Sequence, residues 1–244
     1  SRRAMAIVRS NVIFALLVKA LFLTLAVAGV ATLWMAVIAD VGASLVVVHC
    51  GQIQADTAPE YELRAMFDAG QFDSAAYRAR LAPFMAQRAE LAPACLAALR
   101  KSIIELLAIA RPAGVRLGLE NRYHVLDLPS PDEMEMLLGL GEAEHLGFLF
   151  DIGHAVTLER LGLYPVQEWL ERFGGRILGM HLHDVTGLVD HRAPGLGSVD
   201  FRPLTRCLKD DTICTLELHH HNTPEQIRDG LKILADAGCI RRNQ

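Results

Sequence analysis

The chain has 244 residues, of which 52% are hydrophobic and 21% charged, and its formal net charge is −4. This length and composition fit one globular core and exclude a disordered chain or an array of short repeats. A mildly acidic chain also lacks the overall positive charge that draws proteins to nucleic acid, so no nucleic-acid partner is expected. The five cysteines are scattered without a CxxC pair, which indicates reduced thiols. Cys50 is the only one with a candidate functional role, because it stands next to His49.

The chain opens on an unusual apolar stretch. Residues 20–39 carry no charge, match the length of a membrane span and follow several basic residues. Three interpretations stay open: a buried helix of the core, a membrane or signal segment, and an artefact of the sequence. We treat 1–244 as one domain with an atypical helical segment at 1–43 and its core at 44–244. A membrane association through residues 11–39 is the weaker interpretation, and a cytoplasmic protein is expected.

Short apolar runs follow, separated by longer amphipathic stretches. Continuously apolar strands are typical of a parallel sheet that is covered on both faces. The five expected strands are Ser44–His49, Val115–Glu120, Leu146–Asp151, Ile177–His183 and Thr212–Leu218. An alternation of strand and helix predicts right-handed βα units, which either a doubly wound sheet or a closed barrel can supply.

Helices are expected between these strands. Residues 73–110 suit two helices with a break near Pro83 or Pro93. Ser130 followed by proline is a typical helix start, and Thr223 followed by proline repeats it before a last helix that ends near Gly238. A further helix is expected over Pro165–Phe173.

Acidic or histidine side chains stand at or next to the carboxyl end of every expected strand. A barrel gathers these ends on one rim, whereas an open sheet spreads them along an edge, so the pattern favours the barrel. Three carboxylates and one imidazole without a thiolate suit Mn²⁺, Mg²⁺ or Co²⁺, and Zn²⁺ is also compatible. The sequence therefore predicts one divalent-metal site with the ligands Glu120, Asp151, His181 and Glu217.

Further histidines flank these ligands. The spacing of His154 from Asp151 lets Asp151 bind the metal while His154 faces the substrate or a second metal. His181 and His183 lie two residues apart on one strand, and we expect only one of them to point inward. We choose His181, because Asp184 then begins the loop that follows.

The loop after Asp184 carries His191 and Arg192 and is pinned by proline and glycine residues. Such a loop is expected to orient hydroxyls or a phosphate. The expected substrate-binding set is His49, His154, His183, His191 and Arg192.

Five motifs in this order resemble the xylose isomerase-like TIM barrel superfamily: LVVVHCG, LGLENRYH, FLFDIGHA, GMHLHDVTGLVDHRAPGLGSVDF and TLELHHH. The resemblance is to its sugar phosphate isomerase/epimerase branch, which also includes endonuclease IV, and it spans Ser44 to about Leu234. It implies an α/β fold of the (β/α)8 type, the same four metal ligands, and substrate roles for His154 and His191. His49 matches a histidine that binds metal in the multi-zinc members.

The matched strands look like the last five of eight. About 44 preceding residues are too few for three βα units of around 30 residues each. The barrel is therefore expected to be incomplete or divergent at its N-terminus.

The leading hypothesis is a metal-dependent isomerase or epimerase acting on a sugar, sugar phosphate or related polyol. The metal would bind the carbonyl and a neighbouring hydroxyl, and Glu120 and Glu217 would remove and return the proton through an enediolate. Three alternatives stay open: a dehydratase or lyase on a cyclic polyol, an endonuclease IV-like phosphodiesterase, and a degenerate barrel without catalysis. The expected partner is a small-molecule carbohydrate, and a homo-oligomer also stays open.

Overall fold

The computed structural model describes residues 13, 17, 45–53 and 58–240. The apolar stretch at 20–39 lies outside these residues, and so does the prediction made for it. Within the described ranges, no helix is both long and apolar enough to cross a membrane.

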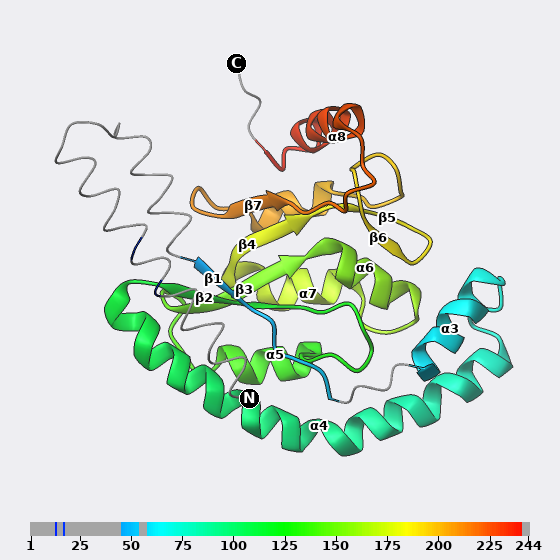
Figure 1. The fold of residues 1–244 in the computed structure, drawn as a ribbon, viewed down its shortest axis with the longest axis horizontal. Coiled ribbons are helices and arrows are strands. Elements are labelled where there is room, and N and C mark those ends of the chain that lie inside the picture. Colours follow the sequence, from blue (N-terminus) through cyan, green and yellow to red (C-terminus); the bar gives the residue numbers. More distant parts are fainter. Residues whose placement is uncertain (1–12, 14–16, 18–44, 54–57, 241–244) are drawn as a thin grey trace.

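Five parallel strands form the main sheet, in the order β1-β2-β3-β4-β7 (Figure 1). All five predicted strands are present, with ends that differ from the prediction by no more than two residues. The register places Asp151 of β3 directly opposite His181 of β4, so both side chains stand at the same height of the sheet. The strands are β1 (Leu45–Val48), β2 (Arg116–Glu120), β3 (Leu146–Asp151), β4 (Ile177–Leu182) and β7 (Ile213–Leu216).

A two-stranded antiparallel hairpin stands apart from this sheet. It consists of β5 (Asp184–Thr186) and β6 (Val189–Arg192). A polar loop was expected from Asp184 onward, and this was wrong: Gly187, at φ +59°, allows the tight turn that pairs the two strands.

Aromatic side chains fill the core between the sheet and its helices. Phe148 and Phe150 of β3 are fully buried, and Phe148 stacks on Trp169 at 5.6 Å between ring centroids. The helices that cover the sheet are α5 (Pro131–Leu138), α6 (Ile152–Arg160), α7 (Val166–Phe173) and α8 (Pro224–Asp236). Short 3-10 turns at Arg111–Ala113, Gly174–Arg176 and Arg202–Cys207 precede β2, β4 and β7. The helix starts predicted at Ser130 and Thr223 are confirmed, since both residues close a capping box.

One long helix, α4 (Ala75–Ala110), replaces the two helices expected over residues 73–110. Figure 1 shows it curving around one side of the molecule, opposite α8. Pro83 and Pro93 both lie inside it on the exposed face. The carbonyls that lose their partner, at Ala79 and Ala89, therefore face water, and a bend toward the core replaces the expected break.

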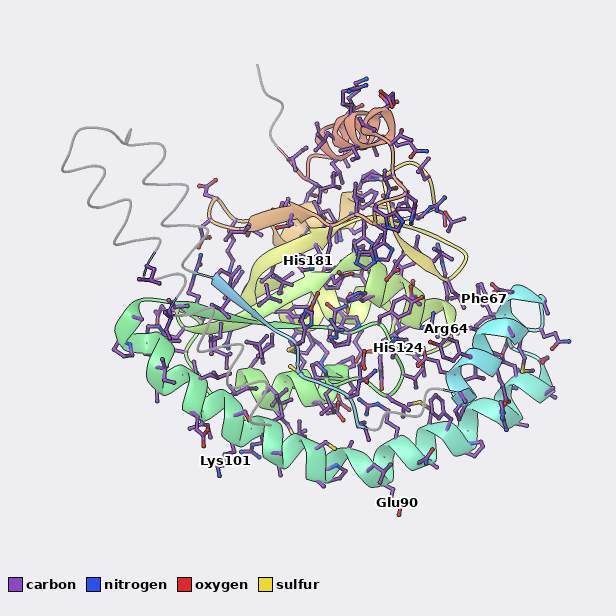
Figure 2. All side chains as sticks on the ribbon, in the orientation of Figure 1. Arg64, Phe67, Glu90, Lys101, His124 and His181 are labelled. Atoms are coloured by element: carbon purple, nitrogen blue, oxygen red, sulfur yellow. The ribbon has the colours of Figure 1, made fainter. Side chains whose placement is uncertain are left out.

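A smaller hydrophobic cluster lies outside the main core. It joins α3 (Ala58–Asp68) and the start of α4 to the segments around Val125, Leu161 and Leu188. Arg64 of α3 lies near His124 (Figure 2), and the buried carboxylate of Glu60 contacts both of them, at 2.8 Å and 2.9 Å. This cluster fixes α3 against the loop that follows β2.

Candidate metal centre

Four acidic or imidazole groups converge where neighbouring strands of the sheet end. Glu120 and Asp151 are the last residues of β2 and β3, His181 lies on β4, and Glu217 follows β7 directly. One ligand atom from each of the four lies within 4.8 Å of the others. Figure 2 shows His181 near the centre of the molecule, at the carboxyl end of β4.

The distances within this group suit a bound cation. Nδ1 of His181 lies 3.0 Å from Glu120 Oε1, 3.4 Å from Asp151 Oδ2 and 2.6 Å from Glu217 Oε2. The His181 nitrogen and the Glu217 oxygen are buried and make no hydrogen bond of acceptable geometry with any described residue. Buried polar atoms without partners are rare unless an ion or water satisfies them. The four residues therefore fit a divalent metal with oxygen and nitrogen ligands.

The electrostatics of the group point the same way. Burial lowers the pKa of His181, but the contacts with Asp151, Glu120 and Glu217 outweigh it and raise that pKa to about 11. Burial raises the pKa of Glu120, yet the neighbouring imidazoles of His181 and His49 bring it to about 2. Three ionised carboxylates this close require positive charge between them, which the imidazolium of His181 supplies here and a divalent cation would supply in its place.

The two glutamates have different surroundings. Oε2 of Glu120 lies 2.6 Å from the exposed ring of His49 and 3.1 Å from Arg122, and the Glu120 side chain is only 1% exposed. The Glu217 side chain is 43% exposed. Cys50, beside His49, is buried, and burial raises its thiol pKa to about 12, so it is not a reactive thiol.

Asp151 is held by a residue that the sequence analysis did not single out. The side chain of Asn121 donates to the backbone oxygen of Asp151 and accepts from its backbone nitrogen, each at 2.8 Å. Asn121 is fully buried. In the sequence, the position of Asn121 directly after Glu120 could have indicated this role, because a buried amide side chain at a strand end needs hydrogen-bond partners.

His183 does not occupy the substrate-binding position expected for it. It is fully buried, and its Nε2 lies 2.9 Å from Asp151 Oδ1 while its Nδ1 accepts the backbone N–H of His191. The lack of a side chain at Gly153 leaves the room for this ring. His183 therefore orients the carboxylate of Asp151, as residues behind metal ligands commonly do.

A second candidate metal group, formed by Asp151, His154 and His191, adjoins the first. Nδ1 of His154 lies 3.0 Å from the carbonyl oxygen of Asn121, which can only accept, so Nε2 of His154 is left without its proton in the neutral ring. That nitrogen is 3.8 Å from Asp190. His191 Nδ1 is buried and lies 3.0 Å from Asp190 Oδ1, but this contact lacks the geometry of a hydrogen bond.

His49, His191 and Arg192 are the remaining predicted residues. The ring of His191 stacks between those of His183 and His219, at 4.3 Å from each. Arg192 ends β6 half-buried, and none of its contacts among the described residues reaches the four ligands. His49 stands at the end of β1 with 58% of its side chain exposed. The structure thus brings His49, His154 and His191 to the centre, but not Arg192.

Comparison with known families accounts for this arrangement. Residues 30–237 match the family model described as xylose isomerase-like TIM barrel. The chain belongs to this family. Its described residues form the five-stranded part of such a barrel, which agrees with the predicted fold and with its incompleteness toward the N-terminus.

Solved structures with a similar fold include a D-tagatose 3-epimerase-like protein, at 20% identity and a TM-score of 0.45, with 83% of this chain and 66% of that chain covered. A Thermus thermophilus protein soaked with zinc chloride gives 22% identity and a TM-score of 0.48, with 86% and 68% covered. An L-ribulose 3-epimerase gives 18% and 0.41, with 82% and 67% covered. The chain thus spans about two thirds of the length of these neighbours. No curated protein matches.

Proposed function

We propose that this chain is a divalent-metal-dependent isomerase or epimerase that moves a proton between neighbouring carbons of a sugar, sugar phosphate or related polyol. The observation that carries the proposal is the convergence of Glu120, Asp151, His181 and Glu217 at the strand ends of a xylose isomerase-like barrel. Their oxygen-rich donor set suits Mn²⁺, Mg²⁺ or Co²⁺, with Zn²⁺ as a further candidate.

A bound cation would polarise a substrate carbonyl and the neighbouring hydroxyl, and so make the C–H bond between them more acidic. The residues around the cation would serve as ligands or transfer the proton. Asp151 and His181 would keep their positions as ligands, because Asp151 is buried and hydrogen-bonded to His183, and only 12% of the His181 side chain is exposed. Glu217 is the more exposed glutamate, so it is placed to take the proton from the substrate. Glu120 is proposed to return it, after its outer oxygen releases His49.

His154 and His191 are proposed to bind the substrate beside these groups. The unprotonated Nε2 of His154 can accept a hydrogen bond from a sugar hydroxyl. His191 is held rigidly between two other rings, so it presents its nitrogens without loss of side-chain freedom on binding. Both interactions select polyhydroxylated substrates over apolar ones.

The test is exchange of substrate protons with D₂O, followed by NMR. The protein is stripped with a chelator, reloaded with Mn²⁺, Mg²⁺, Co²⁺ or Zn²⁺, and given free ketopentoses, ketohexoses and their phosphates. The Glu217→Gln variant should lose about 10²–10⁴-fold in turnover, and the exposed Glu144→Gln should match the parent. If Glu120→Gln and Glu217→Gln both keep the parental turnover with metal bound, the proposal is refuted.

The second candidate function is hydrolysis of a phosphodiester, and the adjoining group of Asp151, His154 and His191 is the observation that favours it. Two metal ions a few ångströms apart suit in-line displacement at phosphorus. Metal content separates the two functions. One tightly bound ion per chain supports the isomerase, whereas two or three zinc ions together with cleavage of abasic DNA support the phosphodiesterase.

A further inference from the structure

The carboxylate of Asp184 lies at the centre of the rim segment that follows β4. Its side chain is buried, and its two oxygens accept four backbone N–H groups. Oδ1 accepts from Val185 at 2.8 Å and from Val199 at 2.9 Å. Oδ2 accepts from Gly195 at 2.8 Å and from Gly197 at 3.0 Å. A single side chain thus closes residues 184–199 into one ring.

The glycines of this segment allow the backbone to wrap the carboxylate. Gly195 has φ +96°, which other residues rarely adopt. A Cβ atom at Gly197 would lie 2.3 Å from the backbone oxygen of Val185 and 2.4 Å from Oδ1 of Asp184. The backbone at Gly195 and Gly197 therefore packs directly against the Asp184 carboxylate, with no room for a side chain. Its N–H groups surround the carboxylate as backbone N–H groups surround a bound anion in other proteins.

His191 stands on this ring in a conformation that its own backbone does not favour. It has φ +54°, a region that non-glycine residues occupy only when the surroundings impose it. Its backbone nitrogen donates to His183, and its backbone oxygen accepts from the side chain of Asn222 at 2.9 Å. Asp184 pairs with Arg192, the residue after His191, across the hairpin.

We propose that Asp184 is a positioning residue for the reaction: by closing the ring it presents His191 and Asp190 to the metal centre without touching substrate or metal itself. The catalytic part of this inference rests on the proposed function. It predicts that loss of the Asp184 carboxylate disturbs the imidazole of His191 and leaves in place the four proposed metal ligands, which lie on the strands or directly after one.

The test compares Asp184→Asn with Asp200→Asn. Asp200 is a matched control because it lies on the same stretch, is exposed, and among the described residues pairs with Arg202. In Asp184→Asn an amide group faces two of the four N–H donors, so that part of the ring opens. We expect its kcat/KM on the ketose that the parent turns over to fall on the order of 100-fold, with its Zn²⁺ affinity within about threefold of the parent. The control should match the parent in both.

Three results overturn the proposal: parental kcat/KM in Asp184→Asn, a loss of Zn²⁺ affinity as large as that in Asp151→Asn, or unchanged amide exchange at Gly195, Gly197 and Val199. If the parent turns over no sugar, the proposed function fails, and the ring proton signals of His191 decide instead. They should lose the shift caused by stacking in Asp184→Asn, and unchanged signals overturn the proposal. Should Asp184→Asn not fold, Gly197→Ala replaces it with the same expected and overturning results.

Discussion

Replacing Gly153 by alanine adds one methyl group at the most crowded point behind the metal centre. The added Cβ would lie 2.0 Å from Cε1 of His183 and 2.5 Å from its Nδ1. Because carbon atoms pack at about 3.5–4.0 Å, the His183 ring must move by about 1.5 Å. Its hydrogen bond to Asp151, at 2.9 Å, cannot survive that movement.

The expected cost follows from three effects. Overpacking a buried site costs about 1–3 kcal/mol, and a lost hydrogen bond to a charged group costs about 1.5–3 kcal/mol. Alanine favours the helical conformation of residue 153 by up to about 1 kcal/mol relative to glycine. Gly153→Ala should therefore lower the free energy of unfolding by about 1.5–6 kcal/mol. Without its orienting histidine, Asp151 should bind metal about 10–100-fold more weakly.

Urea unfolding and titration with Zn²⁺ measure these two effects. Gly175→Ala is the matched control, since a Cβ at Gly175 meets nothing within 4 Å and both properties should stay at their parental values. Parental Zn²⁺ affinity in a folded Gly153→Ala variant would show that His183 does not hold Asp151 in the binding position, and the assignment of His183 would be wrong.

Three further predictions concern other parts of the molecule. Asp151→Asn should weaken Zn²⁺ binding by about 100-fold or more, measured by titration, whereas unchanged affinity removes Asp151 from the ligand set. Arg88→Met should cost about 3–5 kcal/mol in urea unfolding, because Arg88 bonds both oxygens of the buried Glu133; equal stability in Arg88→Met contradicts this. Hydrogen bonding to Glu60 raises the pKa of His124 above 6.5, although burial opposes this shift. The pairing of His124 with Glu60 therefore contributes its full stability below pH 6.5, and this contribution is lost as the pH rises through the raised pKa. His124→Gln should flatten that decline, and an unchanged pH profile of unfolding contradicts the pairing.

The strand-end pattern was enough to predict which four residues would form the metal group. Parallel strands put their carboxyl ends on one edge, so residues such as Glu120 and Asp151 meet whatever the details of packing. Residues two apart on a strand share a face, and His181 and His183 both contact Asp151, so the expectation that only one of them points inward was wrong. The capped starts at Ser130 and Thr223 are local signals, and the helices begin there.

Other features depend on contacts between distant residues. Pro83 and Pro93 did not divide α4, because each lies on its exposed face and the helix as a whole packs against the core. The role of His183 depends on space left at Gly153, and that of Asn121 on a backbone 30 residues away.

Sequence by itself determined the strands and which four residues meet in the candidate metal centre, because these follow from periodicity and from the ends of parallel strands, and its motifs pointed to the family. Tertiary structure alone decided how the ligands are supported. The stack of His183, His191 and His219 joins the end of β4, the hairpin and the segment after β7. The unequal exposure of Glu120 and Glu217 depends on what packs around each strand end. Long-range packing sets such distances, and no local pattern in the sequence encodes them.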